Sequence, residues 1–161
     1  MLHSRAMKGR VVERLVGVLD SATRALGREN PKRLPKHLLT GRRGEDAAYF
    51  YLRRNGYVIT ARNWRSPRHR GELDLVGWDG DVLCFIEVKT RSTREVATAE
   101  AAVDEEKRGD LIAVARDYRR RAARNRTIRG ALCRFDIVSI YFDTENGSPD
   151  ITLFKNAFPM P

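Results

Sequence analysis

The strongest alternation of apolar and polar residues lies within residues 71–90, where two alternating segments flank Asp79-Gly80. A two-residue Asp-Gly turn between alternating segments is a strong signal of a β-hairpin. Counting outward from this turn gives the predicted register. The predicted cross-strand pairs are Trp78 with Asp81, Asp74 with Phe85, and Glu72 with Glu87.

The two faces of this hairpin are predicted to differ, because successive side chains of a strand point to opposite sides of the sheet. The apolar face contains Leu73, Leu75, Val82, Cys84, Ile86 and Val88. The charged face contains Glu72, Asp74, Glu87 and Lys89. Two carboxylates about 5 Å apart repel by roughly 3 kcal/mol at an effective dielectric constant of about 20, so we expect a cation to offset this charge.

A divalent metal ion fits this requirement. Hard metals such as Mg²⁺ take oxygen ligands and commonly bind one or two carboxylates together with a substrate phosphate. Lys89 follows Glu87 by two residues and shares its face, where it is placed to meet a phosphate oxygen or a water. The group predicts a metal-dependent phosphodiesterase site. The alternative is a plain solvated face, since alternating charges are ordinary on a half-exposed antiparallel strand.

Helical and strand periodicity predicts further elements on both sides of the hairpin. They are a helix at 40–55 closed by Gly56, a strand at 57–64, a long helix at 104–125, a strand at 131–142 and a short strand at 151–154. A long helix between two strands is the crossover that allows parallel pairing. We therefore predict an α/β fold with a central mixed β-sheet flanked by helices. Asp136 is interpreted as a structural carboxylate paired with Arg134 or with a helix, and a contribution to the site is the alternative.

The first part of the chain is predicted to lie outside this domain. Apolar residues recur at helical spacing within residues 7–26, and a basic segment with two prolines follows. We interpret residues 1–38 as an N-terminal helix and basic linker, and residues 39–161 as the folded domain. We expect the helix to pack on the domain or extend from it, and a basic helix on a membrane surface or a partner protein is the alternative.

The charge of the chain predicts a polyanionic partner. The 161-residue chain has a formal net charge of +10, which favours nucleic acid ahead of an acidic membrane surface. Arginines cluster in residues 62–70, where they are suited to neutralise phosphates and an interleaved aromatic ring to stack on a base. A solvated charged turn is the alternative interpretation. The candidate nucleic-acid contacts are Arg62, Trp64, Arg65, Arg68, Arg70, Arg91 and Lys107.

The cysteines and the hydropathy indicate a compartment. Cys84 and Cys133 lie in apolar segments without CxxC spacing, which is typical of buried thiols in a reducing environment rather than of a disulfide or zinc site. The sequence has no apolar run long enough to span a bilayer and no signal-peptide pattern. We expect a soluble, cytoplasmic protein.

Several short motifs resemble one known family. They are GRRGEDAA at 41–48, GELDLV at 71–76, FIEVKTR at 85–91, Lys107, and RFDIV at 134–138. Together they are similar to the YraN family, which is placed in the restriction-endonuclease-like PD-(D/E)XK superfamily and resembles archaeal Holliday junction resolvases. The resemblance covers roughly residues 39–158. The chain departs from the superfamily pattern in having Leu73 rather than proline before Asp74.

The resemblance implies a restriction-endonuclease-like αβββαβ core after the N-terminal helical extension. Asp74 and Glu87 would be ligands of Mg²⁺ or Mn²⁺, joined by the backbone carbonyl of Val88, and Lys89 would orient the attacking water or stabilise charge. Glu45 and Glu72 are further candidates as ligands or for water positioning. For Glu45, a favourable acid in the first turn of a helix is an equal alternative.

The leading hypothesis is thus a divalent-metal-dependent DNA endonuclease, with branched or junction DNA suggested by the resemblance alone. The competing hypothesis is a nucleic-acid-binding accessory protein that keeps the fold without turnover. RNA as the substrate is not separable by sequence. A homodimer is also expected if cleavage of a junction is symmetric, because two copies of the site are then required.

Overall fold

The computed structural model describes residues 36–91, 105–142 and 148–160. The chain divides into two compact units, Met1–Pro35 and Lys36–Pro161, and all described residues belong to the second. The predicted helix at 7–26 and the turn at 146–147 lie outside the described residues. The elements are α2 (Lys36–Arg54), β1 (Val58–Arg65), β2 (Glu72–Asp79), β3 (Val82–Arg91), α3 (Glu105–Ala122), α4 (Arg126–Arg129), β4 (Leu132–Phe142) and β5 (Pro149–Phe158).

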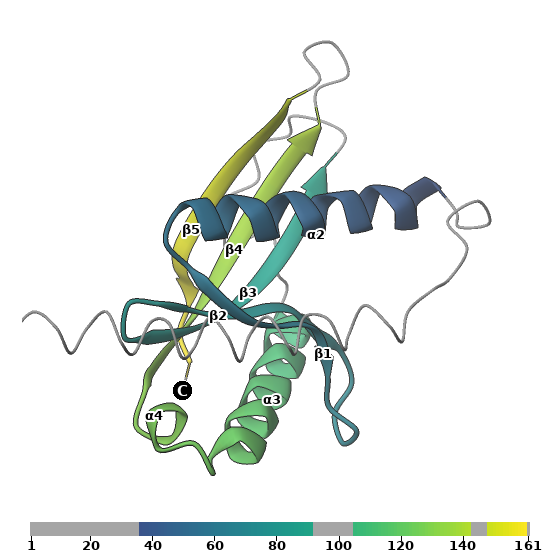
Figure 1. The fold of residues 1–161 in the computed structure, drawn as a ribbon. Coiled ribbons are helices and arrows are strands. Elements are labelled where there is room, and N and C mark those ends of the chain that lie inside the picture. The colour runs from purple at the N-terminus through teal and green to yellow at the C-terminus, as the bar shows by residue number, and fades with distance from the viewer. Residues whose placement is uncertain (1–35, 92–104, 143–147, 161) are drawn as a thin grey trace, which may run out of the picture. The chain divides into compact units, whose positions relative to one another are not determined.

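These elements form an α/β fold around one mixed sheet (Figure 1). The five strands lie in the order β1-β2-β3-β4-β5. Neighbouring strands are antiparallel except β3 and β4, which are parallel and are connected through α3. The predicted mixed sheet with flanking helices is confirmed. Residues 36–38, predicted as linker, belong to α2 instead.

A helix buries each face of the sheet. On one face, Leu111 and Val114 of α3 pack with Phe85 and Phe135. On the other face, Leu52 of α2 packs in a second apolar cluster that also contains residues of β2, β3 and β4. The prediction of one apolar and one charged face was therefore wrong, because the crossover helix covers the second face as well. On that face Glu87 follows Phe85 by two residues of β3 and contacts Lys107 near the start of α3.

The hairpin register also differs from the prediction. Asp79 pairs with Val82, so Gly80 and Asp81 form the turn. Gly80 has a φ of +61°, and glycine at the first central position is the requirement of a type II′ turn. The predicted pairs of Trp78 with Asp81, Asp74 with Phe85 and Glu72 with Glu87 are wrong by two residues. A two-residue change leaves every side chain on its original face.

Strands β1 and β2 change faces together near their outer end. Leu73 packs in the cluster beneath α3, whereas Leu75 packs in the cluster beneath α2. Their partners on β1 are Trp64 and Arg62, and Trp64 also joins the α3 cluster. Between these two β1 residues lies Asn63, whose φ of +50° is in the left-handed region that Asn tolerates better than most residues. The local backbone turn therefore breaks the predicted alternation.

A buried ion network holds the opposite end of the sheet. Arg134 donates from Nε to Asp136 Oδ1 at 2.8 Å, and Tyr57 donates its hydroxyl hydrogen to Asp136 Oδ2 at 3.1 Å. Arg134 also pairs with Asp79 at 2.5 Å. The predicted Arg134–Asp136 pairing is confirmed. Each carboxylate of this network is neutralised by a cationic side chain of the protein. We therefore assign the network a structural role.

Two further findings concern membranes and thiols. Within the described ranges, none of the helices combines the length and the apolar character that crossing a membrane requires. Cys84 and Cys133 are free thiols, and Cys84 is fully buried in the apolar cluster beneath α2.

Gly44→Ala is expected to lower the free energy of unfolding by about 1–3 kcal/mol. A Cβ at this position would overlap Thr90 Oγ1 and lie 3.1 Å from Thr90 Cβ, so the Thr90 side chain must rotate and α2 and β3 must separate slightly beside Glu45 and Lys89. Urea denaturation measures the loss. Gly41→Ala is the control, since its Cβ would meet nothing within 4 Å. Equal losses in both variants would contradict this account of the helix packing.

Candidate functional site

A pocket of about 390 Å³ opens beside the outer end of β2 and the first turns of α3. It is lined by Gly71, Glu72, Asp74, Glu87, Glu106, Lys107, Asp110 and Leu111. Strand β2 supplies Glu72 and Asp74, and β3 supplies Glu87. Three members of the predicted carboxylate group therefore share one pocket. The other acidic lining residues come from α3, which was not predicted to contribute carboxylates.

Asp74 and Glu87 come together where β2 and β3 separate. The last paired residues are Leu75 and Ile86, and continuing this register by one residue places Asp74 opposite Glu87. Instead of a further strand pair, Asp74 Oδ2 accepts the backbone N–H of Val88 at 2.7 Å. The carboxylate thereby replaces a strand hydrogen bond at the edge of the pocket.

Asp74 is held in a state that disfavours its negative charge. Burial and the charge of Glu87 raise the pKa of Asp74 to about 7, with smaller contributions from Glu45 and Glu72, while the hydrogen bond from Val88 opposes the rise. Like charges and burial both favour the protonated form of a carboxyl group. Asp74 therefore titrates near neutral pH. A cation nearby would stabilise its ionised form.

Two lysines neutralise Glu87, whose residue surface is only 5% exposed. Lys107 Nζ lies 2.5 Å and Lys89 Nζ 3.2 Å from the same carboxylate oxygen, Oε1. Burial lowers the pKa of Lys89 and outweighs the opposing effect of Glu87. For Lys107 the hydrogen bond and charge of Glu87 overcome burial and raise the pKa. Lys107 is thus the more firmly charged of the two ammonium groups.

Glu45 approaches this group from α2. It lies well inside the helix, which begins at Lys36, so the interpretation as a first-turn acid is wrong. Asn63 donates from Nδ2 to Glu45 Oε2 at 2.9 Å. The charge of Glu45 contributes to the raised pKa of Asp74, and the left-handed Asn63 is the residue that orients Glu45.

The predicted nucleic-acid residues are divided among several places. Arg62 pairs with Asp46 at 2.5 Å, and its guanidinium lies 4.9 Å from the centroid of the Tyr49 ring, on the α2 side. Trp64 packs edge-on against Tyr118 with the ring centroids 5.2 Å apart. Arg91 ends β3, and Lys107 contacts Glu87.

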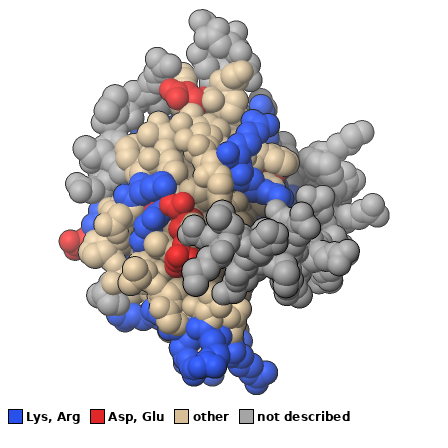
Figure 2. All heavy atoms as spheres, turned by 60° about the vertical axis from the view of Figure 1, so that its left-hand side comes forward, with Lys and Arg blue, Asp and Glu red and all other residues tan. Residues whose placement is uncertain are grey.

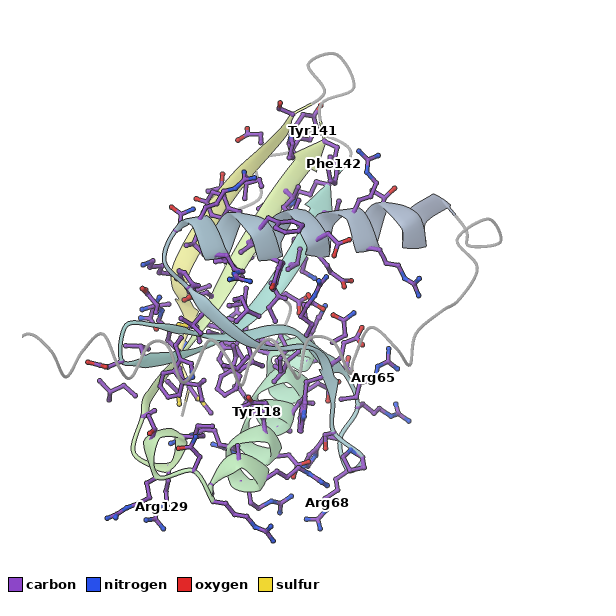
Figure 3. All side chains as sticks on the ribbon, in the orientation of Figure 1. Arg65, Arg68, Tyr118, Arg129, Tyr141 and Phe142 are labelled. Atoms are coloured by element: carbon purple, nitrogen blue, oxygen red, sulfur yellow. The ribbon has the colours of Figure 1, made fainter. Side chains whose placement is uncertain are left out.

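The other arginines of the predicted set lie at the outer end of the β1–β2 hairpin. Arg65 donates to Glu72 at 2.7 Å, while Arg68 and Arg70 are exposed in the loop between the strands. Figure 3 shows Arg65 and Arg68 projecting outward from this end. Arg68 and Arg70 are therefore the members of the set that are available to a large partner on this side.

Comparison with known proteins places the chain in a family. A model of the uncharacterised protein family UPF0102 matches residues 44–140. The chain belongs to the UPF0102 family. It is 58% identical to a UPF0102 protein of Koribacter versatilis over 77% of this chain and 82% of that protein. It is 45% identical to one of Solibacter usitatus over 89% of this chain and the whole of that protein. The resemblance to the YraN family is confirmed at this level.

The donor atoms of this UPF0102 site suit a hard divalent cation, although they do not form a closed cage. Among the described residues, no three or more His, Cys, Asp or Glu side chains converge closely enough to hold a metal ion between them. Mg²⁺ commonly takes only one or two carboxylates and completes its shell with water and phosphate. Asp74 and Glu87 meet that smaller requirement.

Sequence reasoning missed three residues around the site and one in the neighbouring loop. Asn63 carried a signal, since an Asn amid a strand is a candidate for the left-handed conformation. Glu106 and Asp110 lie one turn apart in the sequence, but only the packing of α3 brings them to the pocket. Ser66 looked like a loop residue, and its buried hydrogen bond to α3 had no local signal.

Asp74→Asn is expected to stabilise the protein at neutral and higher pH in chelating buffer. A raised pKa means that the contribution of protonated Asp74 is complete below about pH 4 and is lost as pH rises through about 7. The amide keeps an acceptor for the Val88 N–H and removes the titration. The gain over wild type should grow from pH 4 to pH 8 and reach a few kcal/mol, because a tenfold change in a proton-binding constant corresponds to about 1.4 kcal/mol.

Denaturant unfolding at several pH values measures this difference. Asp81→Asn is the matched control, because Asp81 is exposed in the hairpin turn. A gain for Asp74→Asn that does not change between pH 4 and pH 8 would show that Asp74 is not held protonated.

Proposed function

We propose that this UPF0102 protein is a divalent-metal-dependent nuclease that hydrolyses phosphodiester bonds in DNA. The supporting observation is the meeting of Asp74 and Glu87 at the pocket, with Lys89 on the Glu87 carboxylate. A pair of crowded carboxylates beside an ammonium group is the arrangement that metal-assisted phosphoryl chemistry uses.

Asp74, Glu87 and the backbone carbonyl of Val88 would hold Mg²⁺ or Mn²⁺. The bound ion would polarise the phosphate and lower the pKa of a water molecule. The raised pKa of Asp74 supports this assignment, because ionised Asp74 lies near the charge of Glu87 and a cation would relieve the repulsion.

The other side chains have positioning and electrostatic roles in this proposal. Lys89 would orient the attacking water or stabilise negative charge on the phosphate in the transition state. Glu45 and Glu72 would position water at the rim of the site. Lys107 keeps the Glu87 carboxylate in place through their 2.5 Å contact and faces the same pocket, where a phosphate would enter.

DNA is the proposed substrate because the chain has a net charge of +10 and exposed arginines at the end of the β1–β2 hairpin. A branched or junction DNA and a homodimer are proposed on the YraN and resolvase resemblance. The same resemblance supports a restriction-endonuclease-like core. A cytoplasmic location agrees with this substrate and with the free Cys84 and Cys133 thiols.

Purified protein should cleave DNA with Mg²⁺ or Mn²⁺ and not with chelator. Asp74→Asn, Glu87→Gln and Lys89→Ala should each lower the rate by at least about 100-fold, since the first two remove a metal ligand and the third removes the ammonium group that acts on the water or phosphate. Linear, supercoiled and four-way-junction DNA, with an RNA of matched sequence, define the substrate. Gel assays under single-turnover conditions give the rates.

Asp46→Asn is the control for removal of an acid, because Asp46 pairs with Arg62 on the α2 side. Cleavage that survives in Asp74→Asn or Lys89→Ala would point to contamination. Binding of DNA without cleavage under any condition would favour the accessory protein. Calorimetry with Mn²⁺ provides an independent test, since Glu87→Gln should abolish ion binding.

Asn63→Gly is expected to slow cleavage about 10-fold without loss of stability. Glycine adopts the positive φ of Asn63 but removes the amide that holds Glu45. Asn156→Gly is the matched control, because Asn156 also has a positive φ, of +54°, and lies in β5. Thermal denaturation checks the fold. A wild-type rate in Asn63→Gly would remove Glu45 from the proposed site.

A further inference from the structure

A buried hydrogen bond ties the loop of the β1–β2 hairpin to α3. Ser66, which follows β1, donates from Oγ to Asp117 Oδ2 at 2.7 Å, and the Asp117 residue surface is only 2% exposed. The same Ser66 Oγ accepts the backbone N–H groups of Arg68 at 3.0 Å and His69 at 3.2 Å. One hydroxyl group therefore sets the conformation of the loop and anchors it to the helix.

Two arginines of α3 complete this contact. Arg120 donates to Asp117 Oδ1, and Arg121 donates from Nε to Oδ2 at 3.0 Å. The hydrogen bonds of Ser66 and Arg120, with a smaller contribution from Arg121, hold the pKa of Asp117 well below its usual range. The buried Asp117 carboxylate remains charged, while the side chains of Arg120 and Arg121 are 57% and 48% exposed.

The contact brings two basic segments together on the surface. Arg68 is exposed in the loop, beside the exposed Arg120 and Arg121 at the end of α3. We call these three residues the distal basic surface. Arg70 does not belong to it, because it directly precedes Gly71, which lines the pocket. In Figure 3, Arg68 and Arg129 of α4 project at the same end of the domain, and Figure 2 shows Lys and Arg side chains gathered at that lower end.

The distal basic surface is separated from the pocket along the axis of α3. Lys107 and Asp110 line the pocket from the first turns of the helix, and Arg120 and Arg121 lie in its last turn. An α-helix rises about 1.5 Å per residue, so the thirteen or so residues between them span roughly 20 Å. At about 3.4 Å per base pair, this length corresponds to about six base pairs of duplex DNA.

We infer that the distal basic surface binds the sugar-phosphate backbone of a duplex arm of the substrate, about six base pairs from the phosphate in the pocket. The inference rests on the proposed nuclease function. Backbone contact is favoured over base stacking because Trp64, the aromatic residue that precedes the loop, is packed against Tyr118. Phosphate contacts position a protein on DNA without reading its sequence, so binding at this surface is independent of sequence.

The test measures binding of labelled DNA hairpins to the full chain in chelating buffer, where no metal supports cleavage. Hairpins with duplex stems of about 4, 8, 12 and 20 base pairs are compared at several salt concentrations. Wild-type affinity should increase steeply once the stem exceeds about six base pairs. A single strand of the same length should bind less tightly than the long stems.

Arg68→Gln/Arg121→Gln should bind the long stems about 10-fold more weakly, and the slope of log affinity against log salt should fall by about two. Arg53→Gln/Arg54→Gln is the charge-matched control, since these arginines end α2. Affinity for the shortest stem should be equal in both double variants. Equal weakening in both variants on every stem, or none in either, would overturn the inference.

Ser66→Ala isolates the anchoring of the loop, because it leaves every surface charge in place. Its affinity for long stems should fall, with a thermal midpoint confirming a folded protein, and Ser66→Thr should restore binding because the hydroxyl remains. Tighter binding to phosphatidylserine vesicles than to DNA would replace the duplex with a membrane surface and overturn the inference.

The cleavage assay separates this inference from the proposed function. Metal-dependent cleavage that is lost in Asp74→Asn, combined with unchanged binding by Arg68→Gln/Arg121→Gln, would overturn the duplex contact alone. Binding that depends on the stem length and on Arg68 and Arg121, without cleavage in any metal, would support the surface and refute the nuclease.

Discussion

The repulsion between Asp74 and Glu87 is the constraint on which the candidate site depends. Strands β2 and β3 separate just beyond Leu75 and Ile86, and the two carboxylates meet there at the edge of a buried sheet. Burial makes the interaction stronger than it would be in water, because nearby charges are less screened by solvent. The two carboxylates repel each other, so they stay together because of the covalent and packing constraints of the hairpin.

The surrounding residues offset the repulsion in different ways on the two sides. Glu87 contacts two ammonium groups, those of Lys89 and Lys107. Among the residues that the structure describes, Asp74 accepts a hydrogen bond from one backbone N–H, and its pKa is raised to about 7. The group therefore has one carboxylate that is neutralised by the protein and one that is not. A site of this kind is ready to accept a cation at Asp74 while Glu87 stays ordered, which suits a metal that enters together with a phosphate.

The helix α3 connects this site to the rest of the surface. Its first turns supply Lys107 to Glu87, its middle residues form the apolar cluster with Phe85 and Phe135, and its last turns hold the loop through Asp117 and Ser66. A buried carboxylate that is paired on both sides is costly to disrupt, so this contact fixes where the loop attaches to α3. The same helix thus orders a chemical group at one end and a basic surface at the other.

Within the described residues, the sequence by itself determined the order of the elements apart from α4, the parallel crossover and the grouping of Asp74, Glu87 and Lys89, because periodicity reports how residues alternate within one segment. It did not determine the turn, since Asp79-Gly80 and Gly80-Asp81 are both compatible with the alternation of the flanking strands. In the structure the strand pairing places the turn at Gly80-Asp81. Only the tertiary structure decided that Lys107 binds Glu87 and that Ser66 binds Asp117, across 20 and 51 residues respectively. Such contacts arise from the packing of α3 on the sheet. The alternation of residues within one segment does not predict which side chain from a distant segment will contact it.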